Sequence, residues 1–63
     1  MSRYVECTWF LHDRTVVLSG RVDGDIVRGF AAETEDGEPV RIPDASMPDA
    51  LTDLIEAAEW RNA

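Results

Sequence analysis

Cys7 and His12 are the two side chains of this sequence that could act together as a nucleophile and a base. A thiol is activated when an imidazole within hydrogen-bond reach removes its proton, so both side chains must point to the same place. The residues around them alternate between apolar and polar, as in a β-strand, and the two positions have opposite parity on that strand. We therefore expect no catalytic dyad. Cys7 should be an inward-facing, inert residue, and His12 a solvated turn residue.

Patterns for metals and cofactors are also incomplete. Asp23-Gly24-Asp25 is similar to the start of a calcium loop, but the further oxygen ligands and the closing glutamate of such loops are missing. The acidic residues of 33–38 are explained as the tip of a hairpin, and one cysteine with one histidine does not make a zinc site. The chain has no lysine for a Schiff base and no glycine-rich phosphate loop. These observations predict a protein that is not an enzyme and holds no metal or cofactor.

Acidic and aromatic side chains share one face of a predicted C-terminal helix. With helical spacing, this face carries Asp49, Asp53, Glu56 and Trp60. The opposite face carries Met47, Leu51, Leu54 and Ala58. A tryptophan exposed among carboxylates is typical of a protein-binding surface, because large aromatic side chains anchor interfaces. Helical residues three or four apart lie about 5–6 Å from one another, so such a row of carboxylates can also imitate nucleic-acid phosphates.

Two simpler interpretations of this acidic face remain open. The carboxylates can be the solvated side of an ordinary amphipathic helix. The ring of Trp60 can fold onto the margin of the sheet if the last helical turn frays. Either interpretation would leave the helix without a role in binding.

The net charge bears on the kind of partner. Thirteen Asp and Glu residues against six basic residues give a formal net charge of −7. Every basic residue is an arginine, and the six are scattered along the chain, so the sequence offers no basic patch for a phosphate backbone. We therefore expect no direct nucleic-acid binding, and a protein partner with a basic surface instead.

The elements that position these residues follow from the hydrophobic periodicity, which changes from about two to about 3.6 near residues 43–46. We expect strands at about 3–12, 15–22, 26–34 and 38–42, and a helix at about 47–61. The apolar positions of the first two strands share one face of a hairpin if Leu11 lies opposite Val16 across a loop of four residues. Ser46 is the expected N-cap of the helix, with Asp49 completing a capping box.

Two Asp-Gly turns connect the later strands. An odd-length loop at residues 23–25 would keep Ile26 and Phe30 in the core, although the register of this turn stays open. A three-residue loop with a left-handed Gly37 would place the apolar residues of the third and fourth strands opposite each other. Prolines flank the fourth strand, which marks it as a short edge strand.

Together these elements predict a single α+β domain over residues 1–63. It is a small antiparallel meander of three to four strands with one C-terminal α-helix packed on one face, ββββα. A core of this size is small, so we expect self-association or a partner to add stability. The outward face of the sheet is expected to carry Tyr4, Phe10, Val17 and Val27. We expect a homodimer through that face.

The sequence also bears on location. The first residues contain no apolar stretch like that of a signal peptide, and the longest apolar runs are too short to cross a bilayer. With a single cysteine, these features predict a cytoplasmic protein without a membrane segment.

The helix segment from Ser46 to Leu51, continuing through residues 56–58, resembles the capped helix that follows the sheet in HicB-type antitoxins. The likeness is confined to this segment, and the Pro-Asp-Leu-Pro-Gly stretch typical of that family is missing. The resemblance implies an antitoxin-like partner role as one alternative, and the sequence identifies no family.

These observations favour a small acidic, non-enzymatic protein-binding module. Its expected role is that of an accessory inhibitor or modulator, for example one encoded by a phage, that occupies a basic or nucleic-acid-binding surface of a partner protein. The alternatives are a structural or assembly protein that dimerises through its sheet, and an antitoxin-like partner. The salt dependence of binding distinguishes the inhibitor from the protein that dimerises through its sheet, because an electrostatic contact weakens as ionic strength rises and an apolar contact does not.

Overall fold

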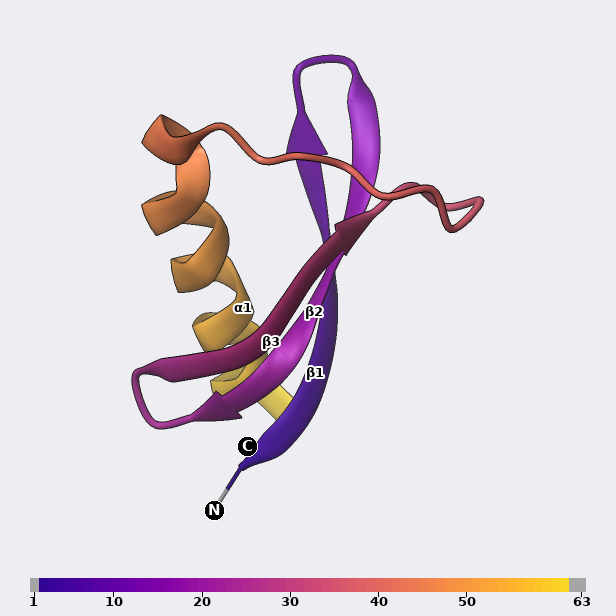
Figure 1. Cartoon of the computed structure of the whole chain (residues 1–63). Coiled ribbons are helices and arrows are strands. Elements are labelled where there is room, and N and C mark those ends of the chain that lie inside the picture. Colours follow the sequence, from indigo (N-terminus) through magenta and orange to yellow (C-terminus); the bar gives the residue numbers. More distant parts are fainter. Residues whose placement is uncertain (1, 62–63) are drawn as a thin grey trace.

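Three antiparallel strands and one C-terminal helix make up the fold, which a computed structural model describes for residues 2–61. The strands form one sheet in the order β1-β2-β3. The helix lies along one face of this sheet (Figure 1). In chain order the elements are β1 (Arg3–Leu11), β2 (Arg14–Asp23), β3 (Ile26–Glu33), the 3₁₀ turn η1 (Asp44–Ser46) and α1 (Met47–Arg61). The predicted α+β class is confirmed.

β1 and β2 form the expected hairpin in a different register. Leu11 lies opposite Arg14 and not opposite Val16, so the predicted pairing is wrong by two residues. The turn contains only two residues, because His12 adopts a positive φ of 57° and closes the hairpin tightly. An even shift leaves every side chain on its predicted face, and Cys7 still faces inward.

The connection between β2 and β3 is shorter than the sequence suggested. Asp23 lies opposite Ile26, so the turn contains two residues and not an odd number. Val22 therefore lies opposite Val27, which faces the core. Ile26, expected in the core, is 56% exposed. The register of this turn, which the sequence left open, is therefore that of a two-residue loop, and Ile26 lies outside the core.

A β-bulge restores the inward face farther along β3. The register shifts between Ser19 and Arg21, where β3 carries one more residue than β2. Gly29 lies in this extra stretch with a φ of +62°, a conformation that glycine adopts without strain. Beyond the bulge Ala32 lies opposite Leu18, and both are buried. One inserted residue therefore exchanges the two faces within a single strand.

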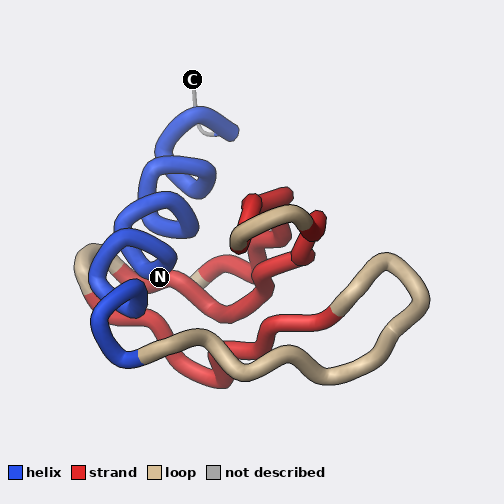
Figure 2. Tube along the Cα trace, turned by 90° about the horizontal axis from the view of Figure 1, so that it is seen from above, coloured by secondary structure: helices blue, strands red, loops and turns tan. Residues whose placement is uncertain are grey.

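Residues 34–43 run from the end of β3 to α1 as a return segment, and the predicted strand at 38–42 is not seen in the described chain (Figure 2). Its ladder with β3 is a single bridge between Glu33 and Pro39. The Val40 N–H donates to the carbonyl of Ala32 at 2.8 Å. Proline has no N–H to donate, so Pro39 and Pro43 prevent the ladder from extending to either side.

The helix begins differently from the prediction. The 3₁₀ turn η1 runs directly into α1, and the Ser46 N–H donates to the carbonyl of Pro43 at 2.8 Å. An N-cap residue needs a non-helical backbone, and Ser46 is already part of the helical turn. Ser46 therefore does not serve as the expected N-cap. The helix itself spans Met47–Arg61, the range that the periodicity indicated.

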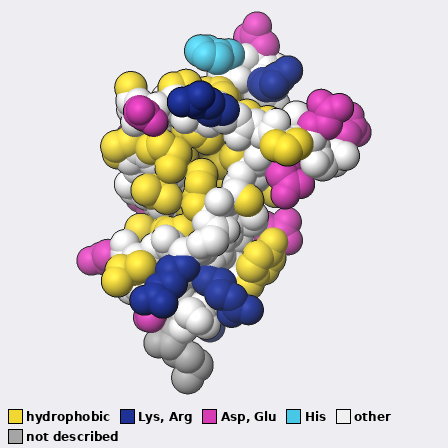
Figure 3. All heavy atoms as spheres, viewed as in Figure 1, with side chains coloured by type: hydrophobic (Ala, Val, Ile, Leu, Met, Phe, Trp, Pro, Cys, Tyr) yellow, Lys and Arg dark blue, Asp and Glu magenta, His cyan; other side chains and the backbone are white. Residues whose placement is uncertain are grey.

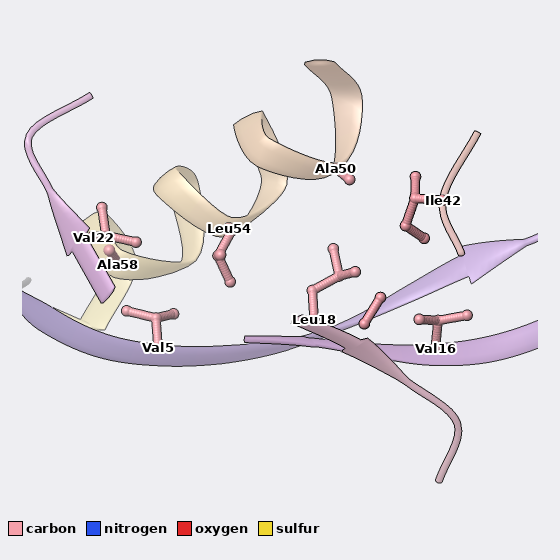
Figure 4. Close-up of a cluster of buried hydrophobic side chains, with 9 residues drawn as sticks. Val5, Val16, Leu18, Val22, Ile42, Ala50, Leu54 and Ala58 are labelled. Atoms are coloured by element: carbon pink, nitrogen blue, oxygen red, sulfur yellow. The ribbon is translucent and has the colours of Figure 1, made fainter. Parts of the chain in front are cut away.

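The core lies between α1 and the inner face of the sheet. Leu54 of the helix and Leu18 of β2 are fully buried and lie close together at its centre (Figure 4). Ile42 of the return segment covers the core near Ala50. The buried hydrophobic residues are Val5, Val16, Leu18, Val22, Ala32, Ile42, Ala50, Leu54 and Ala58. Within residues 2–61, no helix has the length and apolar run needed to span a bilayer.

Candidate partner-binding groove

A groove lies between α1 and β1. It has a volume of about 290 Å³ and is lined by Cys7, Thr8, Asp53, Glu56, Ala57 and Trp60. Cys7 faces the helix, whereas its neighbour Thr8 points its side chain to the other face of the sheet. Because both residues line it, the groove extends around the edge of β1. We call it the α1–β1 groove.

The core sets the rotation of α1 and so decides which side chains reach this groove. Leu54 and Ala58 are buried on one stripe of the helix. The adjacent stripe carries Asp53, Glu56 and Trp60, whose spacing of three and four residues makes them neighbours on the helix surface. Burial of the first stripe therefore turns the second stripe toward the edge of β1.

Trp60 lies at the open end of this stripe, and 79% of its surface is exposed. The ring does not fold onto the margin of the sheet, which was the simpler interpretation of this residue. An indole exposes a large apolar area to water, and covering that area is favourable when a partner binds. Trp60 is therefore the strongest candidate for an anchor residue in the described chain.

The carboxylates beside the indole are solvated. Asp53 and Glu56 are exposed on the rim of the groove, and Cys7 and Ala57 form a less polar floor. An apolar floor with an acidic rim suits a ligand that has an apolar side chain next to positive charge. Asp49, predicted to share this surface, is exposed at the start of α1 and does not line the groove.

Cys7 and His12, the two residues considered for a catalytic dyad, lie in different parts of the structure. His12 is exposed in the β1–β2 turn. Cys7 is half-buried on the inner face, where it lies opposite Leu18 and packs against the core. In residues 2–61, no group of three or more His, Cys, Asp and Glu side chains is placed to hold a metal ion.

The outer face of the sheet, which is the face opposite α1, is only partly apolar. Phe10 is 73% exposed and Tyr4 is 55% exposed, but they lie at opposite ends of β1, about 20 Å apart at the usual rise per residue. Val17 lies between them and is half-buried. Val27, predicted to lie beside them, belongs to the inner face and packs against the core. The outer face therefore lacks the continuous apolar patch that the sequence suggested.

The structure also brings together two arginines that looked scattered in the sequence. Arg21 lies opposite both Tyr4 and Arg28, so the three side chains form a row across the sheet. Like charges directly opposite each other are unfavourable, and an anionic group nearby would relieve their repulsion. In Figure 3, basic side chains gather at two ends of the molecule with hydrophobic surface between them. The register that joins this pair depends on the short β2–β3 turn, which sequence reasoning missed.

A hollow beside this row has the opposite charge. It is lined on the outer face and the return segment by Tyr4, Glu6, Val17, Ser19, Glu33, Thr34, Glu35 and Gly37. The outer face therefore carries arginines at one end and glutamates toward the other.

Comparisons with protein families, with curated proteins and with solved structures find no match to this chain. The α1–β1 groove, the edge of β1 and the outer face are therefore the features from which a function can be inferred.

Proposed function

We propose that this protein is a small, acidic, non-enzymatic binding module that occupies a basic surface of a partner protein. The observation that carries the proposal is the 79% exposed Trp60 beside Asp53 and Glu56 on the rim of the α1–β1 groove. A partner surface that normally holds nucleic acid suits this site, because it combines positive charge with planar groups that stack on aromatic rings. The expected consequence of binding is inhibition or modulation of that partner.

In this proposal the net charge affects the rate of association, and the residues of the groove affect dissociation and orientation. The net charge of −7 attracts a basic surface over a distance and raises the rate of encounter. Trp60 then becomes covered by the partner, and a buried aromatic anchor slows dissociation. Asp53 and Glu56 set the orientation, because an arginine or lysine must reach them while the indole is covered.

The test compares two double variants that change the net charge equally. Asp53→Lys with Glu56→Lys reverses the rim of the groove, and Asp36→Lys with Glu38→Lys reverses two exposed acids in the return segment. Tagged protein is used to recover its partner from the cells in which it occurs, and affinities for that partner are then measured at low and high salt. We expect the rim variant to lose at least about 30-fold in affinity, as removal of an interface hot spot does, and the return-segment variant to lose only a few-fold.

Trp60→Ala provides the second arm of this test. It should cost at least about 2 kcal/mol of binding free energy and leave the fold intact, because the indole is mostly exposed. Competition with the partner's nucleic acid then shows whether the occupied surface is the expected one. Equal losses in both double variants together with no effect of Trp60→Ala would place the contact elsewhere on the molecule.

Self-assembly through the outer face is the second candidate function. It is favoured by the exposure of Phe10 and Tyr4 and by the opposite charges at the two ends of that face. It ranks second because the apolar residues do not form one patch. In this role the protein would be a structural or assembly component, and its oligomeric state is the decisive measurement.

A further inference from the structure

The two edges of the sheet are protected to very different degrees. β3 contains a bulge, and the return segment covers its end through the Val40 N–H bond to Ala32 and the bridge at Pro39. Bulges, prolines and covering loops are the usual means by which proteins prevent another strand from pairing with an edge. β1 has none of these features: it is nine residues long, has no register shift and contains no proline. The β1 edge is therefore the one suited to accept a further strand.

The hairpin geometry indicates which backbone groups face that edge. A two-residue turn is closed by a hydrogen-bonded pair, here Leu11 and Arg14, and bonded pairs then recur at every second residue. The odd residues of β1 therefore direct their N–H and carbonyl groups toward β2. The even residues direct theirs away from it, so Thr8 and Phe10 present backbone donors and acceptors at the outer edge. Thr8 also lines the α1–β1 groove.

We propose that an extended, basic segment of the partner binds as an added strand along the β1 edge, with its inward side chains in the α1–β1 groove. This inference rests on the proposed function, and it specifies the conformation and chemistry of the recognised segment. Side chains alternate along a strand, so every second residue of the segment would face the groove. One inward position lies beside Cys7 and Ala57 and suits a small apolar side chain, whereas its inward neighbours reach the rim carboxylates Asp53 and Glu56.

Charge decides against a second copy of this chain at the same edge. Pairing β1 with β1 of another molecule would bring two acidic rims together, in a chain whose net charge is −7. Close like charges oppose such an approach. A basic segment instead gains both the backbone hydrogen bonds and the attraction of Asp53 and Glu56. The recognised pattern is therefore basic–x–small apolar–x–basic in an extended conformation.

The experiment uses a peptide of this pattern and a chemically matched control. The probe is a capped seven-residue peptide with the sequence Thr-Arg-Thr-Val-Thr-Arg-Thr. The control has the same side chains and charge but carries N-methyl groups on its threonine amides, which removes the N–H donors that would face Thr8. Each is titrated into the protein at low salt. Amide signals of β1 are followed by NMR, and the rate of Cys7 thiol labelling reports whether the groove is occupied.

We expect the unmodified peptide to bind at least about tenfold more tightly than the methylated one, because each lost backbone hydrogen bond weakens binding. Binding should shift the Thr8 and Phe10 amide signals and slow the labelling of Cys7. Thr8→Pro should reduce affinity to the level of the methylated peptide, since proline removes the outward N–H. If Thr8→Pro does not fold, the comparison of the two peptides on the parent protein still shows whether the segment binds as an added strand.

The outcomes separate strand addition from the proposed function. Equal binding of both peptides, weakened by reversal of Asp53 and Glu56, would overturn strand addition and leave recognition of a basic surface in place. No binding of either peptide at low salt would also overturn strand addition. The proposed function is tested separately from both peptide results. It is supported if the parent recovers a partner and the rim variant does not, and it is contradicted if the rim variant recovers the same partner equally well.

Discussion

At the residue scale, Gly20 shows how closely α1 and β3 approach β2. A Cβ atom added at this position would lie 2.9 Å from Cγ1 of Val27 and 3.3 Å from Cδ2 of Leu54. Real Cβ atoms do not tolerate the shorter distance, so one of the neighbours would have to move. Because Gly20 has no side chain, Val27 of β3 and Leu54 of α1 can both pack closely against the backbone of β2.

Gly20→Ala should therefore lower the free energy of unfolding by about 1–3 kcal/mol, the usual cost of overpacking a core. Ser19→Ala, the neighbouring position on the outer face, is the control and should change stability by less than about 0.5 kcal/mol. Urea unfolding followed by circular dichroism measures both. An unchanged unfolding midpoint for Gly20→Ala would mean that the helix packs farther from β2 than the structure has it.

At the element scale, the bulge in β3 decides which apolar residues reach the core. Before it, Val27 faces inward, and beyond it Ala32 does. A strand without the bulge would keep one parity throughout and would turn one of these two residues outward. Sequence reasoning considered a single parity for the whole strand, which would place Ile26 inside, and left the register of the preceding turn open. The signal that could have corrected it is Gly29, because a glycine inside a strand pattern often marks a bulge.

Gly29→Ala should destabilise the fold by about 1–2 kcal/mol for a conformational reason. Nothing lies within 4 Å of a Cβ added there, but the backbone has a φ of +62°. Gly29→Asn should lose less, because asparagine tolerates this region better than alanine does. The measurement is again the unfolding free energy. Equal losses for the two substitutions would point to a steric cause, contrary to the open space around this position.

The edge strand β1 is the other element with consequences for function. Its length and alternating pattern were predicted from the sequence, and so was the helix beside it. Its role as an unprotected edge could not be predicted, because that depends on the strand order and on the return segment covering the opposite edge. The expected fourth strand also failed to appear, since its flanking prolines lack the donors that a ladder needs.

At the scale of the whole molecule, the outer face and the net charge act in opposite directions on self-association. Copies of a chain with a net charge of −7 repel one another. The outer face, however, carries Arg21 and Arg28 at one end and glutamates around the hollow toward the other. A twofold axis parallel to the plane of the sheet and perpendicular to its strands would place the arginine end of one copy over the glutamate end of the other.

We expect the protein to self-associate at micromolar concentrations through this face, as measured by sedimentation equilibrium. Arg28→Glu should abolish association by removing the complementary charge, and Phe10→Ser should weaken it by removing exposed apolar area. Glu56→Lys, which lies on α1 and away from the outer face, is the control and should leave association intact. A monomer at all concentrations would remove self-assembly as a candidate function and would not bear on the α1–β1 groove.

The sequence by itself determined the α+β class, the span of α1, the inward side of β1 and the acidic stripe with Trp60. These features are local: each follows from the period of apolar residues along one element, which a few neighbouring side chains define. Only the tertiary structure decided the hairpin registers, the bulge, the missing fourth strand and the meeting of α1 with β1. These depend on contacts between residues far apart in the chain, where a shift of one residue exchanges buried and exposed faces. The α1–β1 groove belongs to this second group, because Cys7 and Trp60 come together only when the core sets the rotation of the helix.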